Sequence, residues 1–291
     1  MTFSFNVAII GPGRIGQALG RLLAQSRVPI AVVAGRQLSA ATRGARFIGM
    51  GKPISVADLQ PQSAAVFLIT TSDSSLAEVA SNLARQGTGK NPWRGKVVLH
   101  TCGSLPSGIL SPLKQRGAAI GSLHPYQTVP SPRTGVRSLC ECFWAVEGDR
   151  RAARVARDLI KMLQGTAFSV RPEEKMLYHL SAFLVCPTVV TLMAQSADLL
   201  KKAGVPPKIS RPMLRQFVAE TARNFADFGG SRALTGPAVR GDWTTICRHR
   251  AALRRSAPEF ISVYESLLKA MLRLANKSEE RGPKSKVPLT T

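Results

Sequence analysis

The fold is decided by the segment FNVAIIGPGRIGQALG, residues 5–20. Its first six residues form a continuous apolar run, which predicts a buried strand. The run leads directly into GPGRIG, residues 11–16, which matches the pattern G-x-G-x-x-G. Leucine and isoleucine side chains then recur at the spacing of one helix face. A glycine pattern between a strand and an amphipathic helix is the context that dinucleotide binding requires.

Each position of this turn has an expected role. Gly11 permits the tight turn, Gly13 lets the backbone approach a pyrophosphate, and Gly16 allows the helix to pack closely on the sheet. Arg14 and Ile15 begin the helix, whose free N–H groups and partial positive charge favour phosphate. We therefore expect these five residues to bind the cofactor.

The second strand ends in Ala34-Gly35-Arg36, about 20 residues past the glycine turn. An NAD-binding protein would place Asp or Glu there to accept hydrogen bonds from the ribose hydroxyls. A guanidinium cannot accept such a bond but suits a 2′-phosphate. Arg36 therefore favours NADP (NADPH) over NAD, unless it is one more surface arginine of an arginine-rich chain.

Strand-like runs alternate with helical patterns as far as residue 172. Such alternation predicts a doubly wound, mostly parallel sheet, hence a Rossmann domain over residues 1–172. The expected strands are Phe5–Ile10, Ile30–Ala34, Ala65–Thr70, Lys96–His100, Ala118–Leu123, Phe143–Glu147 and Ala167–Val170.

From Glu173 onward the pattern changes to long helices without strands. The stretch 173–203 could form one helix of about 31 residues, roughly 46 Å long, with Pro187 kinking it or splitting it in two. We expect an all-helical domain over residues 173–275. The polar tail 276–291, with two prolines and a glycine, is predicted to be disordered.

The charge is unusual, with 40 Lys and Arg against 17 Asp and Glu and a formal net charge of +23. Such an excess attracts anions. The basic residues are spread along the chain, however, and with three Trp and three Tyr no stacking platform for bases is visible. The sequence therefore predicts no specific nucleic-acid partner.

Five cysteines without a C-x-x-C pair indicate reduced thiols, a cytoplasmic location and no metal site. The N-terminal apolar run reads as a strand rather than as a signal peptide. The later apolar stretch, residues 177–200, contains a histidine, a proline and an aspartate. It is a poor membrane span and is expected to be a buried helix.

Ligands of open α/β sheets bind beyond the carboxyl ends of the strands. Residues at these ends are therefore further cofactor contacts, namely Thr70, Ser72, Cys102 and Gly103. His100 and His124 lie at the same edge. Either could donate a proton near a nicotinamide, and either could be a structural histidine.

Two more groups of polar residues lie in the helical half. Lys175 and His179 share a helix face with four-residue spacing, and Tyr178 lies between them. Asp242 precedes a predicted helix in the Arg240-Gly-Asp turn. We expect His124, Lys175, His179 and Asp242 to be catalytic, with Arg240 or Asp242 orienting the substrate. An N-cap role for Asp242 and solvated helix faces for the others are the alternatives.

Six motifs together resemble a bacterial family that joins a Rossmann-like, NADP-oxidoreductase-type domain to the domain of unknown function 2520. The motifs are GPGRIG (11–16), HTCGSLPSGIL (100–110), SLHPYQT (122–128), AVEGD (145–149), LYHLSA (177–182) and ALTGPAVRGDWTTICRH (233–249). The family is distantly similar to pyrroline-5-carboxylate reductases and β-hydroxyacid dehydrogenases. The resemblance therefore implies a helical domain like the C-terminal domain of 6-phosphogluconate dehydrogenase and a homodimer formed through it.

The resemblance implies an oxidoreductase that moves hydride to or from a carbonyl or imine of a small molecule at the interdomain cleft. One departure is Pro187, where related dehydrogenases have an asparagine near the substrate. Proline offers neither a side-chain amide nor a backbone N–H. The alternative is therefore a catalytically weak or inactive NADP sensor. A polyanion-associated protein is a third hypothesis, suggested by the charge alone.

Overall fold

The structure is a computed structural model that describes residues 5–279, and it divides into two compact units. The first unit ends at Cys186 and the second begins at Pro187, so the helix that follows residue 172 belongs to the first unit. The last helix continues to Glu279. The expectation of disorder was therefore wrong for residues 276–279, whereas residues 280–291 lie outside the described part of the chain.

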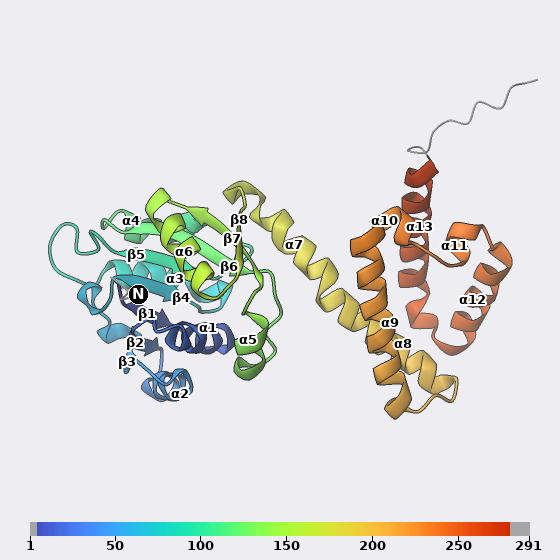
Figure 1. The fold of residues 1–291 in the computed structure, drawn as a ribbon, viewed down its shortest axis with the longest axis horizontal. Coiled ribbons are helices and arrows are strands. Elements are labelled where there is room, and N and C mark those ends of the chain that lie inside the picture. Colours follow the sequence, from blue (N-terminus) through green and yellow to red (C-terminus); the bar gives the residue numbers. More distant parts are fainter. Residues whose placement is uncertain (1–4, 280–291) are drawn as a thin grey trace, which may run out of the picture. The chain divides into compact units, whose positions relative to one another are not determined.

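The first unit contains one eight-stranded sheet with the order β3-β2-β1-β4-β5-β6-β7-β8 (Figure 1). All neighbouring strands are parallel except β6 and β7, which are antiparallel. The predicted mostly parallel, doubly wound sheet is confirmed. The strands are β1 (Val7–Ile10), β2 (Ile30–Gly35), β3 (Lys52–Ser55), β4 (Val66–Ile69), β5 (Val97–His100), β6 (Ala119–Pro125), β7 (Phe143–Gly148) and β8 (Thr166–Ser169).

The sequence did not predict β3, whose residues KPIS lie at the edge of the sheet. This strand is short, contains Pro53 and has no buried residue. It therefore lacks the apolar run by which the other strands were recognised. Pairing with β2 defines it, with Val33 opposite Pro53.

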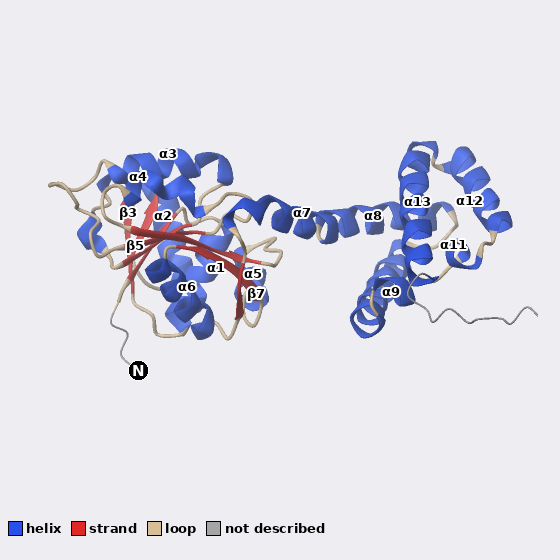
Figure 2. Ribbon diagram, turned by 90° about the horizontal axis from the view of Figure 1, so that it is seen from above, coloured by secondary structure: helices blue, strands red, loops and turns tan. Residues whose placement is uncertain are grey.

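Helices cover both faces of the sheet (Figure 2). Apolar side chains of α1, α2, α5 and α6 pack on one face, and those of α3 and α4 pack on the other. The sheet is buried between two layers, which explains why its strands read as continuous apolar runs. The helices are α1 (Arg14–Gln25), α2 (Leu38–Ile48), α3 (Asp73–Ala84), α4 (Ser111–Lys114), α5 (Pro132–Ser138), α6 (Arg150–Met162) and α7 (Lys175–Val185).

The second unit is all-helical in the described residues, as predicted (Figure 1). Its buried apolar cluster is small, with Ala238, Ile246 and Leu268 at its centre. Many large apolar side chains of this unit are instead exposed. The helices are α8 (Pro187–Lys202), α9 (Pro207–Phe228), α10 (Gly230–Ala233), α11 (Pro237–Arg240), α12 (Trp243–Ser256) and α13 (Ile261–Glu279).

The expected long helix is split, because α7 ends at Val185 and α8 begins at Pro187. Proline is well accommodated as the first residue of a helix, where its missing N–H would have had no acceptor. The run Pro172–Lys202 has a mean hydropathy of 1.7 and is long and apolar enough to cross a membrane by length and composition. None of its apolar window is buried, so the expectation of a buried helix was wrong. A single such run is weak support for a membrane span.

Candidate functional site

A cavity of about 550 Å³ lies at the carboxyl ends of β1, β2 and β4. This is the point where the strand order reverses, with β1 between β2 and β4, and ligands of open α/β sheets bind at such a point. Five of the predicted cofactor residues line the cavity, namely Gly11, Gly13, Arg36, Thr70 and Ser72. The glycine turn and the arginine at the end of β2 therefore face one space.

The glycines of the turn differ in what surrounds them. Gly11 has φ +85°, and a Cβ there would lie 2.5 Å from Cγ2 of Thr71. A Cβ at Gly16 would lie 2.6 Å from the carbonyl oxygen of Gly11. A Cβ at Gly13, by contrast, would meet nothing within 4 Å. Glycine is therefore required at residues 11 and 16 by the packing of the protein. At Gly13 the fold would accept a side chain, and its absence leaves open space over the N-terminus of α1.

The other predicted cofactor residues are not part of the cavity wall. Arg14, Ile15 and Gly16 form the first turn of α1, whose N-cap is Gly13. Amides of a first helical turn have no acceptor within the helix, so they are available to an anion. Cys102 and Gly103 follow β5, two strands away from β1 in the sheet.

One carboxylate in the cavity wall was not expected from the sequence. Glu78 lies on α3 and lines the cavity together with Val79 and Asn82. Near the end of β2, where an acid is expected in an NAD-binding protein, the wall is formed by Gly35, Arg36 and Gln37. Glu78 is 42 residues from Arg36 in the chain, so only the tertiary structure brings it to this cavity.

Lys175 is one of the most deeply buried charged residues of the first unit, with 2% of its surface exposed. Its Nζ donates to the carbonyl oxygen of Cys102 at 3.0 Å and to Oγ of Ser122 at 2.7 Å, and lies 3.4 Å from Oε1 of Glu147. Burial lowers the pKa of Lys175, against the opposing effect of Glu147. Its three N–H donors are thus matched by three acceptors, and it fastens α7 to β6, β7 and the loop after β5.

Glu147 completes this cluster. Its carboxylate accepts from the backbone N–H of Ser107 at 2.7 Å and from the Ser107 hydroxyl at 2.6 Å. A buried ion pair needs such additional hydrogen bonds to offset the loss of hydration. Sequence reasoning missed this role, although a glutamate that ends the apolar run FWAVEG was a signal that a buried partner was needed.

His124 is partly exposed and lies near the end of β6. Its Nδ1 is 2.7 Å from the hydroxyl of Tyr178, and its ring centroid is 6.2 Å from that of His179. Burial, and then the charges of Lys175 and His179, lower the pKa of His124 to about 4. The structure therefore brings together three of the four predicted catalytic residues, with His124 neutral at physiological pH.

His100 has no exposed surface, and its Nδ1 accepts from the backbone N–H of Cys102 at 3.1 Å. Burial, followed by the charge of Lys175, lowers its pKa to about 3. His100 is therefore a buried structural histidine, which is one of the two roles that the sequence left open.

Asp242 and Arg240 lie in the second unit. Asp242 is the N-cap of α12, where its Oδ1 accepts from the backbone N–H of Thr245 at 3.0 Å and its Oδ2 from the Thr245 hydroxyl at 2.7 Å. These hydrogen bonds lower the pKa of Asp242. Asp242 therefore caps α12, which is the alternative role that the sequence left open.

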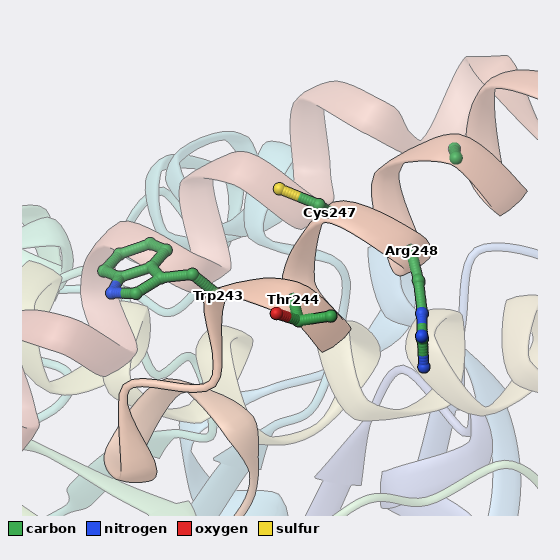
Figure 3. A pocket seen from close by; sticks show the side chains of 5 residues that line it. Trp243, Thr244, Cys247 and Arg248 are labelled. Carbon is green, nitrogen blue, oxygen red and sulfur yellow. The ribbon is translucent and has the colours of Figure 1, made fainter.

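A hollow of about 510 Å³ lies along the exposed face of α12 (Figure 3). Figure 3 shows the side chains of Trp243, Thr244, Cys247 and Arg248 around it, all from this one helix. Trp243 is 53% exposed, although it is the largest apolar side chain there. The motif that ends in ICRH therefore displays apolar surface rather than a cluster of acid–base groups.

Two family models match the chain. A Rossmann-like domain matches residues 2–125, and a domain of unknown function (DUF2520) matches residues 142–271. These are the two domains that the sequence motifs resembled. Ser122 and His124 fall in the first match, whereas Glu147, Lys175 and Tyr178 fall in the second. Comparison with curated proteins finds no match.

Solved structures share the fold. A Bacteroides fragilis protein, provisionally described as an NADP oxidoreductase, is 24% identical with a TM-score of 0.75, over 92% of this chain and 98% of that one. A Thermotoga maritima protein is 22% identical with a TM-score of 0.71, over 94% and 100%. A reductive aminase from Aspergillus terreus, in complex with NADPH and ethyl levulinate, is 14% identical with a TM-score of 0.65, over 96% and 100%.

Proposed function

We propose that this protein, in which a Rossmann-like domain precedes a DUF2520 domain, is a cytoplasmic, homodimeric NADP(H)-dependent oxidoreductase. Its substrate would be a small molecule with a carbonyl or imine carbon. One observation carries the proposal: the glycine turn at the N-terminus of α1 and the guanidinium of Arg36 face the same cavity. This combination suits a pyrophosphate joined to a 2′-phosphorylated ribose. The bound NADPH of the reductive aminase supports the same assignment.

The residues fit the cofactor in a specific way. The open space over Gly13 would admit the pyrophosphate close to the backbone, and the first-turn amides of α1 would donate to it. Arg36 would form charge-assisted hydrogen bonds to the 2′-phosphate. NADPH, when bound, supplies the hydride.

His124 is the proposed hydrogen-bond donor to the substrate, because it is partly exposed at the carboxyl edge of the sheet. Lys175 holds the loop of Cys102 in place rather than acting as the acid, since its three donors are already used. His179 lies beside His124 and contributes to its low pKa. Asp242 acts as a helix cap.

The homodimer is supported by apolar surface in the second unit. Phe217 is 72% exposed and Phe225 is 64% exposed, both on α9. A domain of this size needs a larger buried core to be stable alone, and a second copy of the chain would cover these side chains. Light scattering after size exclusion should give the mass of a dimer. Phe217→Glu should lower the measured mass, and a monomeric wild-type chain would contradict the proposal.

Cofactor binding is tested by titrating the protein with NADPH and with NADH, following the fluorescence of the reduced nicotinamide. We expect tighter binding of NADPH. Arg36→Asp should weaken NADPH binding by roughly tenfold to a hundredfold, the equivalent of one or two charge-assisted hydrogen bonds. Arg43→Asp makes the same charge change at an exposed position of α2 outside the cavity wall and serves as the matched control. Equal losses in both variants would mean that Arg36 does not read the 2′-phosphate.

Turnover is tested with the same protein on a panel of small ketones, aldehydes and cyclic imines, by loss of NADPH absorbance. An oxidoreductase should consume NADPH with at least one of them, and His124→Phe, which removes the donor, should lower the rate by ~100-fold or more at unchanged NADPH affinity. Tight NADPH binding without turnover across the panel would instead support the sensor that Pro187 suggested from the sequence.

A further inference from the structure

The imidazole of His124 is bounded on two sides by different parts of the chain. Its Nδ1 lies 2.7 Å from the hydroxyl of Tyr178 on α7. Its opposite edge covers Gly103, where a Cβ would lie 2.6 Å from Nε2. One ring nitrogen is therefore bonded to α7, and the lack of a side chain at Gly103 leaves room beside the other.

The chemistry of the two groups decides which one donates. A phenol O–H is a better donor than a neutral imidazole N–H, and the unprotonated imidazole nitrogen is a better acceptor than the phenol oxygen. Burial raises the pKa of Tyr178, so this hydroxyl keeps its proton. Tyr178 therefore donates to Nδ1, and the single proton of the neutral ring resides on Nε2.

Ionisable groups on several elements act on this ring. Lys175 and His179 on α7 oppose protonation of His124, whereas Asp73 on α3 favours it. The rings of Tyr126 and Tyr178 have centroids 5.6 Å apart. The combined effect, with burial first, keeps the ring neutral above about pH 4.

The position of Tyr178 is fixed independently of His124. Lys175, one turn earlier on α7, is held by its three acceptors. The Tyr178 ring packs against Phe168 with centroids 6.0 Å apart. The hydroxyl of Ser181 donates to the carbonyl oxygen of Tyr178 at 2.6 Å and lies 3.1 Å from the hydroxyl of Tyr126. The Tyr178 hydroxyl thus reaches His124 from a rigid support.

We propose that Tyr178 is a positioning residue, whose hydroxyl holds His124 in the Nε2–H tautomer so that a neutral imidazole donates a hydrogen bond to the substrate. The inference rests on the proposed function for its substrate, a carbonyl or imine. As hydride supplied by NADPH adds to the carbonyl or imine carbon, the π electron pair moves onto its oxygen or nitrogen, and Nε2–H stabilises the developing charge. That oxygen or nitrogen then takes a proton from water. A neutral imidazole can serve in this way without titrating.

The tautomer can be measured without any substrate. Protein labelled with ¹⁵N-histidine is recorded in long-range ¹H–¹⁵N spectra from pH 8 to pH 5, and His124→Gln assigns the ring. We expect the Nε2–H pattern throughout this range. Tyr178→Phe should shift the tautomer ratio about fivefold toward Nδ1–H, the equivalent of one neutral hydrogen bond of ~1 kcal/mol.

Tyr126→Phe is the matched control, because it removes a neighbouring hydroxyl whose partner is Ser181 rather than His124. Its His124 spectrum should match that of the wild type. An Nδ1–H pattern in the wild type would overturn the proposal, even if no variant folds. An unchanged ratio in a folded Tyr178→Phe protein would overturn it as well.

Turnover gives a second, separate readout. Tyr178→Phe should lower kcat about fivefold, with the NADPH Kd unchanged and no new limb in the pH profile between pH 5.5 and 8. A larger NADPH Kd would indicate a structural role instead. If no carbonyl or imine is turned over by the wild type, the proposed function fails, whereas the tautomer measurement still decides the role of Tyr178.

Discussion

Replacing Gly13 by alanine separates the requirements of the fold from those of the cofactor. The new Cβ would meet nothing within 4 Å, and the backbone there has φ −76°, which alanine adopts readily. Alanine is a poorer N-cap than glycine, but it also restricts the unfolded chain, and these two effects oppose each other. The free energy of unfolding should therefore change by no more than about 0.5 kcal/mol.

The same methyl group would occupy the space into which a pyrophosphate must move to reach the amides of α1. Losing one charge-assisted hydrogen bond costs about 1.5–3 kcal/mol, which is roughly a tenfold to hundredfold increase in Kd. We therefore predict that Gly13→Ala folds like the wild type and binds NADPH at least tenfold more weakly. Fluorescence titration gives the Kd, and urea unfolding gives the stability.

Gly16→Ala is the matched comparison, because its Cβ would lie 2.6 Å from the Gly11 carbonyl oxygen and also press on Thr70. It should destabilise the first unit by about 1–3 kcal/mol through overpacking. Trp93 and Trp144, both fully buried in this unit, report the unfolding by their fluorescence. Normal NADPH affinity in Gly13→Ala would refute the placement of the pyrophosphate over this glycine.

Two further predictions concern titration and capping. His100 has a pKa of about 3 in the folded chain, whereas the ordinary value is 6.5. Because the unfolded state binds the proton more readily, the free energy of unfolding decreases as the pH falls below 6.5. Between pH 7.5 and 5, His100 accounts for a loss of about 2 kcal/mol in the free energy of unfolding. Urea unfolding of His100→Asn should therefore show a smaller dependence of stability on pH than the wild type. An equal dependence in both proteins would be inconsistent with a neutral buried ring. Asp242→Ala should lower the melting temperature of the helical unit by several degrees, because it removes the cap of α12. NADPH affinity and turnover should be unchanged. A loss of turnover at normal stability would instead indicate that Asp242 is catalytic.

The acid–base cluster could be predicted only in part. The sequence predicts His124, Lys175 and His179 because they lie at a strand end and on one helix face. It does not show the partners that order His124 and Lys175. Tyr178 lies 54 residues from His124, and Glu147 lies 28 residues from Lys175. Such contacts depend on how β6, β7 and α7 pack, and no local pattern encodes that packing.

Asp242 shows how a local pattern leaves two roles open. The distinctive polar turn predicts a catalytic residue, and in the folded chain the Asp242 carboxylate caps α12. A side chain that caps a helix and one that binds a ligand have the same local sequence, since both need a short polar group before a helix. Burial and hydrogen bonding in the folded chain distinguish the two.

The sequence by itself determined the Rossmann sheet apart from β3, the turn GPGRIG and the arginine that follows β2. Each of these depends on residues close together in the chain, because apolar runs, glycine turns and helix faces are local patterns. The tertiary structure alone decided three other features. It placed Glu78 in the cavity at the carboxyl ends of β1, β2 and β4, buried Lys175 against β6 and β7, and brought the Tyr178 hydroxyl within 2.7 Å of His124. These features join segments distant in sequence, whose approach follows from the packing of the whole sheet with its helices.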